Sequence, residues 1–453
     1  MRKNAKQVAV IGAGFTGLVA AYRLSQMSYD VTLFEKGKTL GGLASGTKIN
    51  GCNIERAYHH WFTTDTDILS LVEELRLADI LKYRKSSTAL CTGGKVYPFT
   101  GALDLLRYKP LSFFSRLRAG FVVMYLRFEK NWRPLSKVAA LRWMERFSGR
   151  QVTEVLWRPL LQAKFHNFYA SISMAWLWAR IHIRARSRAK GISGEVLVYP
   201  KGGFAVVSDA LCGKLRENGV KIVTEANIKK IDANFSMPYL VVGDDRQDFD
   251  AIIAAIPSPA FNFLTQDSVN ISASYRTKLS SVPYLSAVCA IFSSTQDIGE
   301  HYWHSVNDTE APFLVFINHT KLVPKEDYGG VCVYYMAAYV PEAHRLMKLS
   351  EEDVWKEWFA YLEKLFPQFD QNNVVEKIFS RFKNAQHIVD TKYEEKILPY
   401  ETPIPGVYIS NFTQIFPEDR GTNYAVREGN VVAKLAAKRL EFSNSLGGFE
   451  IKN

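Results

Sequence analysis

The chain has 453 residues, 47% of them hydrophobic, and a formal net charge of +12. This length exceeds the usual size of a single hydrophobic core, so we expect two domains. No apolar run reaches about 18 residues, so no membrane-spanning helix is predicted. The positive charge favours an anionic partner, either an acidic membrane surface or a phosphorylated substrate, although a solvated basic surface explains it equally well. No nucleic-acid-binding motif is present, so we expect no nucleic-acid partner.

The five cysteines are scattered and form no C-x-x-C pair, which predicts neither a metal site nor a disulfide framework. The basic N-terminus leads directly into the first predicted strand and lacks the apolar region of a signal peptide. We therefore expect a cytoplasmic protein. Peripheral attachment to the inner face of a membrane is a second expectation.

A dinucleotide-binding pattern opens the chain. An apolar strand over residues 8–11 is followed by Gly12, Gly14 and Gly17, a helix, and a second strand that ends at Glu35. This spacing is typical of a turn whose glycines let the backbone approach a pyrophosphate at a helix N-terminus, while the acid binds ribose hydroxyls. Glu35 would repel a 2′-phosphate, which argues against NADP. The cofactor-binding residues predicted here are Gly12, Ala13, Gly14, Thr16, Gly17, Glu35 and Lys36.

The next glycine pair extends this pattern. Glu35-Lys36 leads to Gly41-Gly42-Leu43-Ala44-Ser45. The sequence resembles the amine-oxidase group of flavoproteins, which includes monoamine oxidases, protoporphyrinogen oxidase, phytoene desaturases and, more distantly, UDP-galactopyranose mutase. The resemblance implies FAD as the cofactor. It also implies that Gly41, Gly42, Leu43 and Ala44 lie beside the flavin diphosphate and ribityl chain.

Two later segments continue the resemblance. A turn over residues 199–204 precedes a predicted helix over 205–218 and predicted strands at 220–223, 228–231 and 249–256. A strand over 406–411 then leads to a glycine-led helix from Gly421. The resemblance implies that Ile228 lies at the adenine end of FAD and that Asn411 binds phosphate or ribityl oxygen. Asn423, Tyr424 and Ala425 would stand at the helix N-terminus facing the flavin pyrimidine ring.

The predicted fold class is therefore α/β, with a Rossmann-type FAD-binding domain and a discontinuous α+β substrate domain. Residues 1–60, 195–260 and 400–445 are assigned to the FAD-binding domain. Residues 61–194 and 261–399 are assigned to the substrate domain. The first of these insertions is predicted to be mostly helical. The second alternates strands, at 287–292 and 331–339, with a helix around 351–365.

Two short stretches are candidates for contact with substrate. The first, residues 55–62, follows the cofactor turn and contains Tyr58, His59 and His60, which can position a polar substrate or carry protons near pH 7. Adjacent histidines in extended chain point to opposite faces, so only one is expected to face the flavin. The second, residues 416–420, places Arg420 just before the flavin-facing helix. For residues 55–62 the alternative is aromatic packing with a hydrogen-bonded histidine. For residues 416–420 the alternative is a surface salt bridge.

Residues 111–133 have a basic amphipathic pattern. One face carries apolar residues, and arginines and lysines flank it: Leu111, Phe114, Leu117, Phe121, Met124, Tyr125 and Phe128, with Arg116, Arg118, Arg127, Lys130 and Arg133. Such a helix either packs on the core or lies in a membrane interface, and protoporphyrinogen oxidase has its membrane-binding region in a similar place. The core-facing interpretation is the preferred one. Nearby, residues 157–165 could supply a cation to an anionic substrate.

The function predicted from these features is that of an FAD-dependent oxidoreductase resembling protoporphyrinogen oxidase and the desaturases. It would remove a hydride from an amine, an isoprenoid-like compound or another activated C–H substrate. Whether this small molecule is anionic or lipid-like stays open. One rival is a flavin-dependent nucleotide-sugar mutase, in which arginines would hold a diphosphate. The other rival is a non-catalytic flavoprotein subunit.

Overall fold

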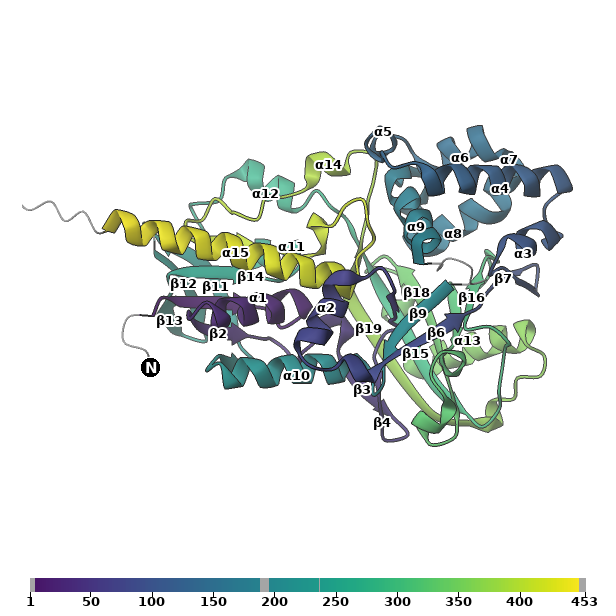
Figure 1. The fold of residues 1–453 in the computed structure, drawn as a ribbon, viewed down its shortest axis with the longest axis horizontal. Coiled ribbons are helices and arrows are strands. Elements are labelled where there is room, and N and C mark those ends of the chain that lie inside the picture. The colour runs from purple at the N-terminus through teal and green to yellow at the C-terminus, as the bar shows by residue number, and fades with distance from the viewer. Residues whose placement is uncertain (1–4, 188–194, 236, 448–453) are drawn as a thin grey trace, which may run out of the picture.

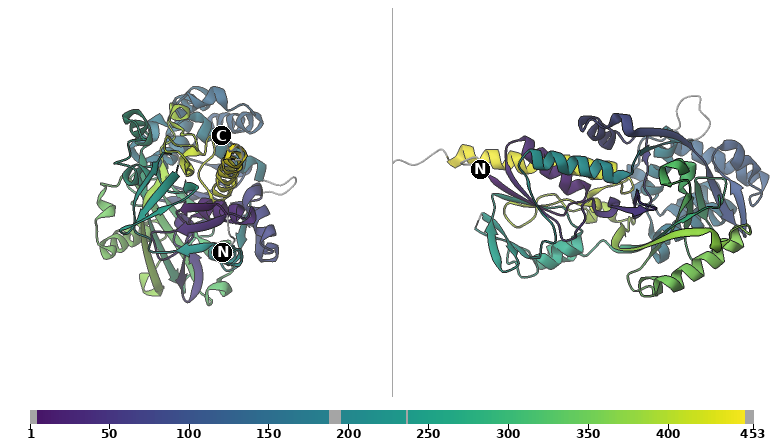
Figure 2. Two further views of the ribbon diagram at one scale, coloured as in Figure 1. Left: turned by 90° about the vertical axis from the view of Figure 1, so that its left-hand side faces the viewer. Right: turned by 90° about the horizontal axis from the view of Figure 1, so that it is seen from below.

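The computed structural model describes residues 5–187, 195–235 and 237–447. Met1–Asn4, on which the absence of a signal peptide was predicted, lie outside the described residues. An elongated molecule results, with the long C-terminal helix α15 at one end and a group of helices at the other (Figure 1). Two further views show the same two ends (Figure 2).

A five-stranded sheet lies beside α15, and all its strands pair in parallel. Its order is β10-β2-β1-β14-β20. The strands come from three separated parts of the chain: Gln7–Ile11 (β1), Asp30–Phe34 (β2), Lys221–Val223 (β10), Ala251–Ala254 (β14) and Val407–Ile409 (β20). The predicted α/β class and its Rossmann-type sheet are therefore confirmed. The exact domain boundaries stay a prediction.

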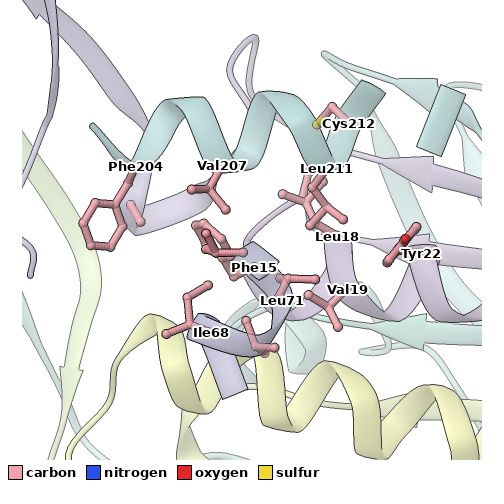
Figure 3. Close-up of a cluster of buried hydrophobic side chains, with 14 of the residues drawn as sticks. Phe15, Leu18, Val19, Tyr22, Ile68, Leu71, Phe204, Val207, Leu211 and Cys212 are labelled. Atoms are coloured by element: carbon pink, nitrogen blue, oxygen red, sulfur yellow. The ribbon is translucent and has the colours of Figure 1, made fainter. Parts of the chain in front are cut away.

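Both faces of this sheet are covered, which explains the nearly continuous apolar runs in its strands. Val8 and Val10 face helices α1 (Phe15–Gln26), α10 (Phe204–Glu217) and α15 (Thr422–Gly447). Figure 3 shows side chains of α1 between those of α10 and those of α2 (Thr66–Glu74). Ala9 and Ile11 face the opposite side, where an antiparallel sheet packs, made of Ile228–Asn234 (β11), Met237–Val242 (β12) and Asp245–Asp248 (β13).

A second, mixed sheet has the order β19-β15-β18-β17-β16-β7-β8. Helix α13 (Glu351–Leu365), at the predicted bounds, covers one face. The strands are Thr88–Thr92 (β7), Lys95–Pro98 (β8), Tyr284–Ser294 (β15), Trp303–Val306 (β16), Val315–Asn318 (β17), Cys332–Val340 (β18) and Val374–His387 (β19). A smaller antiparallel sheet joins Trp61–Phe62 (β5), Leu81–Ser86 (β6) and Glu195–Pro200 (β9).

The insertion predicted to be mostly helical therefore contains strands over 81–98. β6 reads Leu-Lys-Tyr-Arg-Lys-Ser and is largely exposed, so it has no apolar alternation that would indicate a strand. The rest of the insertion is helical: Ala102–Arg107 (α3), Phe113–Phe128 (α4), Arg133–Ser136 (α5), Ala140–Ser148 (α6), Arg150–Val152 (α7), Arg158–Phe165 (α8) and Met174–Ser187 (α9).

Helix α4 corrects the preferred interpretation of residues 111–133. Leu111 is buried ahead of the helix, and α4 itself buries only Ala119, Val122 and Leu126. The other apolar residues of the predicted face are exposed. The exposed side chains make few core contacts because α4 packs on its neighbours through Ala119, Val122 and Leu126. Within the described part of the chain, no helix is both long and apolar enough to cross a bilayer.

Candidate functional site

The first glycine turn connects β1 to α1. Gly12 has φ +94°, and a Cβ there would lie 2.5 Å from the Ala255 carbonyl oxygen. A Cβ on Gly17 would lie 1.9 Å from the Gly12 carbonyl oxygen. Both positions require glycine for steric reasons within the protein. Gly14 is different, because its Cβ would meet nothing closer than the Gly42 Cα at 4.0 Å.

The second glycine pair lies directly against the first turn. Gly41 donates its N–H to the Ala13 carbonyl at 2.8 Å and forms a bridge with Gly14. Gly41 and Gly42 both have positive φ. The open space at Gly14 is therefore flanked by two glycine turns and by the N-terminus of α1, whose N-cap is Gly14. Unpaired N–H groups at such a terminus attract phosphate.

Glu35 closes this end of the site. Its carboxylate accepts the N–H of Ala13 at 2.7 Å and that of Gly37 at 2.8 Å. Its carbonyl accepts the N–H of Ala226 at 2.9 Å, which brings the segment leading to Ile228 beside it. The family resemblance implies that the Ile228 segment lies at the adenine end of FAD, and this stays a prediction.

We call the open space at Gly14, with the two glycine turns around it, the cradle. The remaining residues predicted for the N-terminal turns lie around it. Thr16 is half-buried in the first turn of α1, and Lys36 is exposed just after Glu35. Leu43 and Ala44 form a short 3-10 helix with Gly42, with Ala44 buried. These positions agree with a ligand lying along the turns. Lys36 is exposed, and no contact among the described residues places its side chain against the turns.

Asn411 has a structural role. Its Nδ2 donates to the Ile256 carbonyl at 2.9 Å, and its Oδ1 accepts from the Thr413 N–H at 2.9 Å. The side chain is buried, and it caps the short helix Phe412–Gln414. Both polar atoms thus already have partners, so the structure does not support the expected side-chain contact of Asn411 with phosphate or ribityl oxygen.

Helix α15 begins at Thr422 and is the last element of the predicted cofactor site. Gly421 is exposed, and Thr422 accepts the Trp61 Nε1–H at 2.7 Å. Asn423 is buried and accepts the Ile68 N–H at 3.1 Å, so its side chain holds α2 against α15. Tyr424 and Ala425 are half-buried in the first turn. The backbone at this terminus, more than the Asn423 side chain, is what remains for a ligand.

Tyr58, His59 and His60 lie between the two larger sheets and contact different partners. Tyr58 packs edge-on against Trp303 and Tyr335 and hydrogen-bonds Tyr339. His59 Nδ1 lies 2.7 Å from the Ala57 carbonyl, and His60 Nδ1 lies 3.0 Å from the Tyr302 hydroxyl. Burial lowers the pKa of His59 to about 4 and that of His60 to about 3. Both imidazoles are therefore neutral at pH 7, and Arg420 is close enough to affect the pKa of both Tyr58 and His59.

Arg420 lies beside Tyr58, as predicted from the sequence order. Its Nη2 donates to the Tyr339 hydroxyl at 2.7 Å, and its Nε donates to Gln386 Oε1 at 3.2 Å. Arg420 and Lys164 lower the pKa of Tyr339 against the effect of its burial. Burial and Tyr339 raise the pKa of Tyr58 well above its usual range. The two tyrosines form a hydrogen-bonded pair in which only Tyr339 is acidified.

Asp419 binds two further cations next to Arg420. Its Oδ2 lies 2.8 Å from Lys164 Nζ and 2.8 Å from an Arg180 Nη1 atom. These neighbouring cations hold the pKa of Asp419 well below its usual range, although burial opposes this. Among the described residues, no other carboxylate pairs with Lys164, Arg180 or Arg420. Lys164 and Arg180 thus share one carboxylate, and Arg420 is close enough to help lower its pKa. We call Lys164, Arg180, Asp419 and Arg420 the cationic cluster.

His387 lies against the cationic cluster. Both of its ring nitrogens are buried without a hydrogen-bond partner among the described residues. The ring stacks on Phe412 at 5.1 Å, and burial lowers its pKa, an effect to which Arg420 and Lys164 add. A buried imidazole with two free nitrogens is unusual, because such groups are normally paired. His387 is thus a buried polar group next to the cationic cluster whose hydrogen-bonding capacity the described residues do not use.

Glu55 fixes the stretch before Tyr58 to the middle cofactor segment. Its carboxylate accepts the Tyr199 hydroxyl at 2.7 Å and the Phe204 N–H at 2.5 Å. The side chain is fully buried, and burial raises its pKa to about 7. Gly203 lies so close that a Cβ would be 2.9 Å from Glu55 Oε1. Glu55 positions Tyr58 through the backbone and does not face the cationic cluster.

Sequence reasoning missed three of these residues as site residues: Glu55, Tyr339 and His387. Tyr339 and His387 belong to strands β18 and β19, where nothing in the pattern separates them from core residues. Lys164 and Asp419 were noticed only as parts of a basic stretch and an acid–base insert. No group of three or more potential metal ligands occurs among the residues that the structure describes.

Comparison with known proteins identifies the family. Residues 15–411 match flavin containing amine oxidoreductases. The chain belongs to this family. Coproporphyrinogen III oxidase of Staphylococcus aureus is 25% identical over 296 residues, covering 58% of this chain and 63% of that protein. The chain thus spans less than two thirds of that relative's length.

Solved structures show the same fold. An oxidoreductase from Methanosarcina mazei matches with a TM-score of 0.74 at 17% identity, over 94% of this chain and 100% of that one. Reduced UDP-galactopyranose mutase matches with a TM-score of 0.73 at 14% identity, over 98% of this chain and 94% of that one. The family predicted from the motifs is confirmed, and with it a flavin as the class of cofactor. The open space at Gly14, beside the N-terminus of α1, fits that group.

Proposed function

We propose that this chain binds FAD and oxidises an anionic small molecule at an activated C–H bond beside the Tyr58–Tyr339 pair. The flavin, when bound, supplies the two-electron acceptor. Gly12, Gly14, Gly17, Gly41 and Gly42 would hold its diphosphate, and Glu35 its ribose. The N-terminus of α15 would face its ring, because Gly421 is exposed directly after Arg420.

The observation that carries the proposal is the excess of positive charge in the cationic cluster. Among the described residues, Lys164 and Arg180 both pair with Asp419, while the Arg420 guanidinium hydrogen-bonds the neutral groups of Tyr339 and Gln386. Removing cations from water without matching anions is costly, so an anion bound beside them would be favoured. Arginine also binds carboxylate or phosphate through two parallel hydrogen bonds. These groups would orient the substrate so that its reacting carbon faces the flavin.

Tyr339 is the residue suited to accept the proton that leaves with the hydride. Arg420 and Lys164 lower its pKa, and the Arg420 guanidinium holds its hydroxyl at 2.7 Å. As the phenolate, Tyr339 would take this proton on its oxygen, and the bound flavin would supply the two-electron acceptor. Tyr58, whose pKa is raised, would stay protonated and donate its hydrogen bond to Tyr339.

The test is to follow the flavin absorbance of the purified full chain under anaerobic conditions. Candidate amines, isoprenoids, porphyrinogens and nucleotide sugars are added in turn. Bleaching by an anionic compound is expected. Lys164→Met and Arg420→Met should then keep the flavin and lower kcat/KM for that compound by about a hundredfold or more. Bleaching by a cationic amine, unchanged in both variants, would contradict the proposal.

A second candidate is a redox-neutral nucleotide-sugar mutase, which the cationic cluster also favours because a diphosphate carries two or more negative charges. The fold similarity to UDP-galactopyranose mutase is compatible with it. The same experiment separates the two. A mutase converts the nucleotide sugar only after dithionite has reduced the flavin, and the flavin is not consumed.

A further inference from the structure

Helix α4 lies in the group of helices at one end of the molecule (Figure 1). It and its neighbours carry many exposed apolar side chains. Of the 17 exposed large hydrophobic side chains among the described residues, ten lie between residues 103 and 147. We call these ten the α4 face: Leu103, Leu106, Phe113, Phe114, Leu117, Phe121, Met124, Tyr125, Phe128 and Phe147. Single exposed apolar residues are common, but a contiguous cluster marks an interaction surface.

The α4 face follows the length of one helix. Phe114, Phe121 and Phe128 recur every seven residues and are 80%, 75% and 69% exposed. At 1.5 Å per residue, they form a line about 21 Å long parallel to the helix axis. A planar partner that lies along the helix can therefore contact all three rings at once. A small pocket on a partner would cover only one of them.

Aromatic rings extend this surface from α4 to α6. Tyr125 stacks on Trp143 at 6.3 Å, and Trp143 contacts Phe147 at 4.4 Å. Between the helices lies an open hollow of about 630 Å³, lined by Phe114, Leu117, Arg118, Phe121, Val122, Tyr125, Trp143 and Phe147. Tryptophan and tyrosine, with an apolar body and a polar atom, are typical of the boundary between water and lipid.

Positive charge surrounds the same surface. Residues 101–150 contain eleven lysines and arginines against three acidic residues, a net charge of +8 out of +12 for the chain. Ten of the eleven basic side chains are exposed: Arg107, Lys109, Arg118, Arg127, Lys130, Arg133, Lys137, Arg142, Arg146 and Arg150. An apolar stripe rimmed by cations complements lipid tails below and anionic headgroups around them.

We propose that the α4 face docks on an anionic lipid bilayer, with α4 parallel to the membrane plane. Phe114, Phe121 and Phe128 enter the headgroup boundary, and the exposed arginines and lysines contact the acidic headgroups. The protein lies on the membrane without spanning it. Helix α15 extends to the opposite end of the molecule, away from this membrane (Figure 1).

The test is co-sedimentation of the purified full chain with vesicles of phosphatidylcholine alone or mixed with phosphatidylglycerol. Binding is expected on the mixed vesicles only, and it should weaken as salt rises. Phe121→Asp together with Phe128→Asp should lower the partition coefficient at least tenfold. Phe263→Asp is the matched control, since Phe263 is 65% exposed on α11 (Ser258–Leu264), away from the α4 face. It should bind like the unmodified chain.

The charge is tested separately. Arg127→Gln with Arg142→Gln should weaken binding to the mixed vesicles by about fivefold per residue, the usual effect of one cation at an anionic surface. Lys325→Gln with Lys348→Gln, which neutralises two exposed lysines elsewhere, should have no such effect. Flavin content and melting temperature show in each case that the variant is folded.

Two results would overturn the proposal. One is binding to phosphatidylglycerol vesicles that the phenylalanine variants leave unchanged. The other is a chain that ignores vesicles but elutes as an oligomer, with Phe121→Asp and Phe128→Asp converting it to a monomer. The α4 face would then be an interface between copies of the chain. Neither result bears on the flavin assay, so the docking proposal and the proposed oxidation fail independently.

Discussion

Gly12, Gly14 and Gly17 belong to one motif, yet their surroundings differ. Added Cβ atoms on Gly12 and Gly17 would collide with backbone atoms of the protein itself, whereas the space at Gly14 is open. Gly14 also has φ −72°, which any residue adopts. Gly12 and Gly17 are thus required by the fold, whereas Gly14 would be required by the ligand that binds there.

This difference predicts opposite outcomes for two substitutions. Gly14→Val should fold with little loss of stability but lose the flavin, because the side chain fills the path of the pyrophosphate. Gly17→Val should fail to fold stably, since its Cβ would overlap the Gly12 carbonyl. Circular dichroism and visible flavin absorbance measure the two properties. A well-folded Gly14→Val protein with stoichiometric flavin would refute the assignment of this cradle.

Glu55 predicts a pH dependence of stability. Its pKa rises from about 4.5 to about 7 on folding, so the folded state holds the proton more tightly. Its contribution to stability is therefore complete below about pH 4.5 and is lost as the pH rises through about 7. The free energy of unfolding should fall by about 3 kcal/mol between about pH 5 and pH 8 from this group alone.

Glu55→Gln is the matching variant, because an amide imitates the protonated acid. Urea titrations across the same pH range should show a flatter profile for the variant than for the unmodified chain. Equal slopes in the two proteins would mean that Glu55 keeps an ordinary pKa in the folded state.

At the scale of elements, α1 and α15 approach closely at one glycine. A Cβ on Gly429 would lie 2.6 Å from the Thr16 carbonyl oxygen and 2.9 Å from Val19. Gly429→Ala should therefore push the helices apart and destabilise the protein by about 1–3 kcal/mol, the usual cost of overpacking. Gly213→Ala on α10 is the control, because its Cβ would meet nothing within 4 Å. Thermal unfolding of both variants measures the contrast.

Some strands and helices could be predicted from sequence patterns and others could not. The strands of the parallel sheet were predictable because burial on both faces makes them continuous apolar runs, as in Val8–Ile11 and Ala251–Ala254. β6 was not, because its side chains are charged and its pairing with β9 depends on tertiary contact. The orientation of α4 was likewise undetermined, since an amphipathic pattern does not tell protein from lipid or water.

In the candidate site, motif spacing predicted the cradle but not the substrate side. The spacing of the glycines and Glu35 along the chain indicates the strand–turn–helix geometry of the cradle. Tyr339 and His387 reach the cationic cluster only because β18 and β19 flank β15 in the mixed sheet. The capping role of Asn411 depends equally on Ile256 and Thr413, which lie near it only once the chain has folded.

At the scale of the whole molecule, the cradle joins three separated parts of the chain. Glu35 links the first glycine turn to the segment at Ala226, and Gly429 of α15 packs against Thr16 at the start of α1. A ligand bound there must stabilise all of them together. FAD at a hundred times its Kd should add about 2.7 kcal/mol to the free energy of unfolding. Differential scanning calorimetry of flavin-free chain should show the melting temperature rise with added FAD, and Gly14→Val should show no rise.

The position of β20 has a consequence for biosynthesis. β20 completes the parallel sheet beside β14, yet it comes at residues 407–409, and α15 follows it. Until the ribosome has made β20, one edge of β14 has no partner strand. All four residues of β14 are buried in the folded protein, so this apolar edge is open to pairing with other nascent chains. Pairing so distant in sequence is slow. The chain should therefore depend on chaperone protection until its last segment emerges.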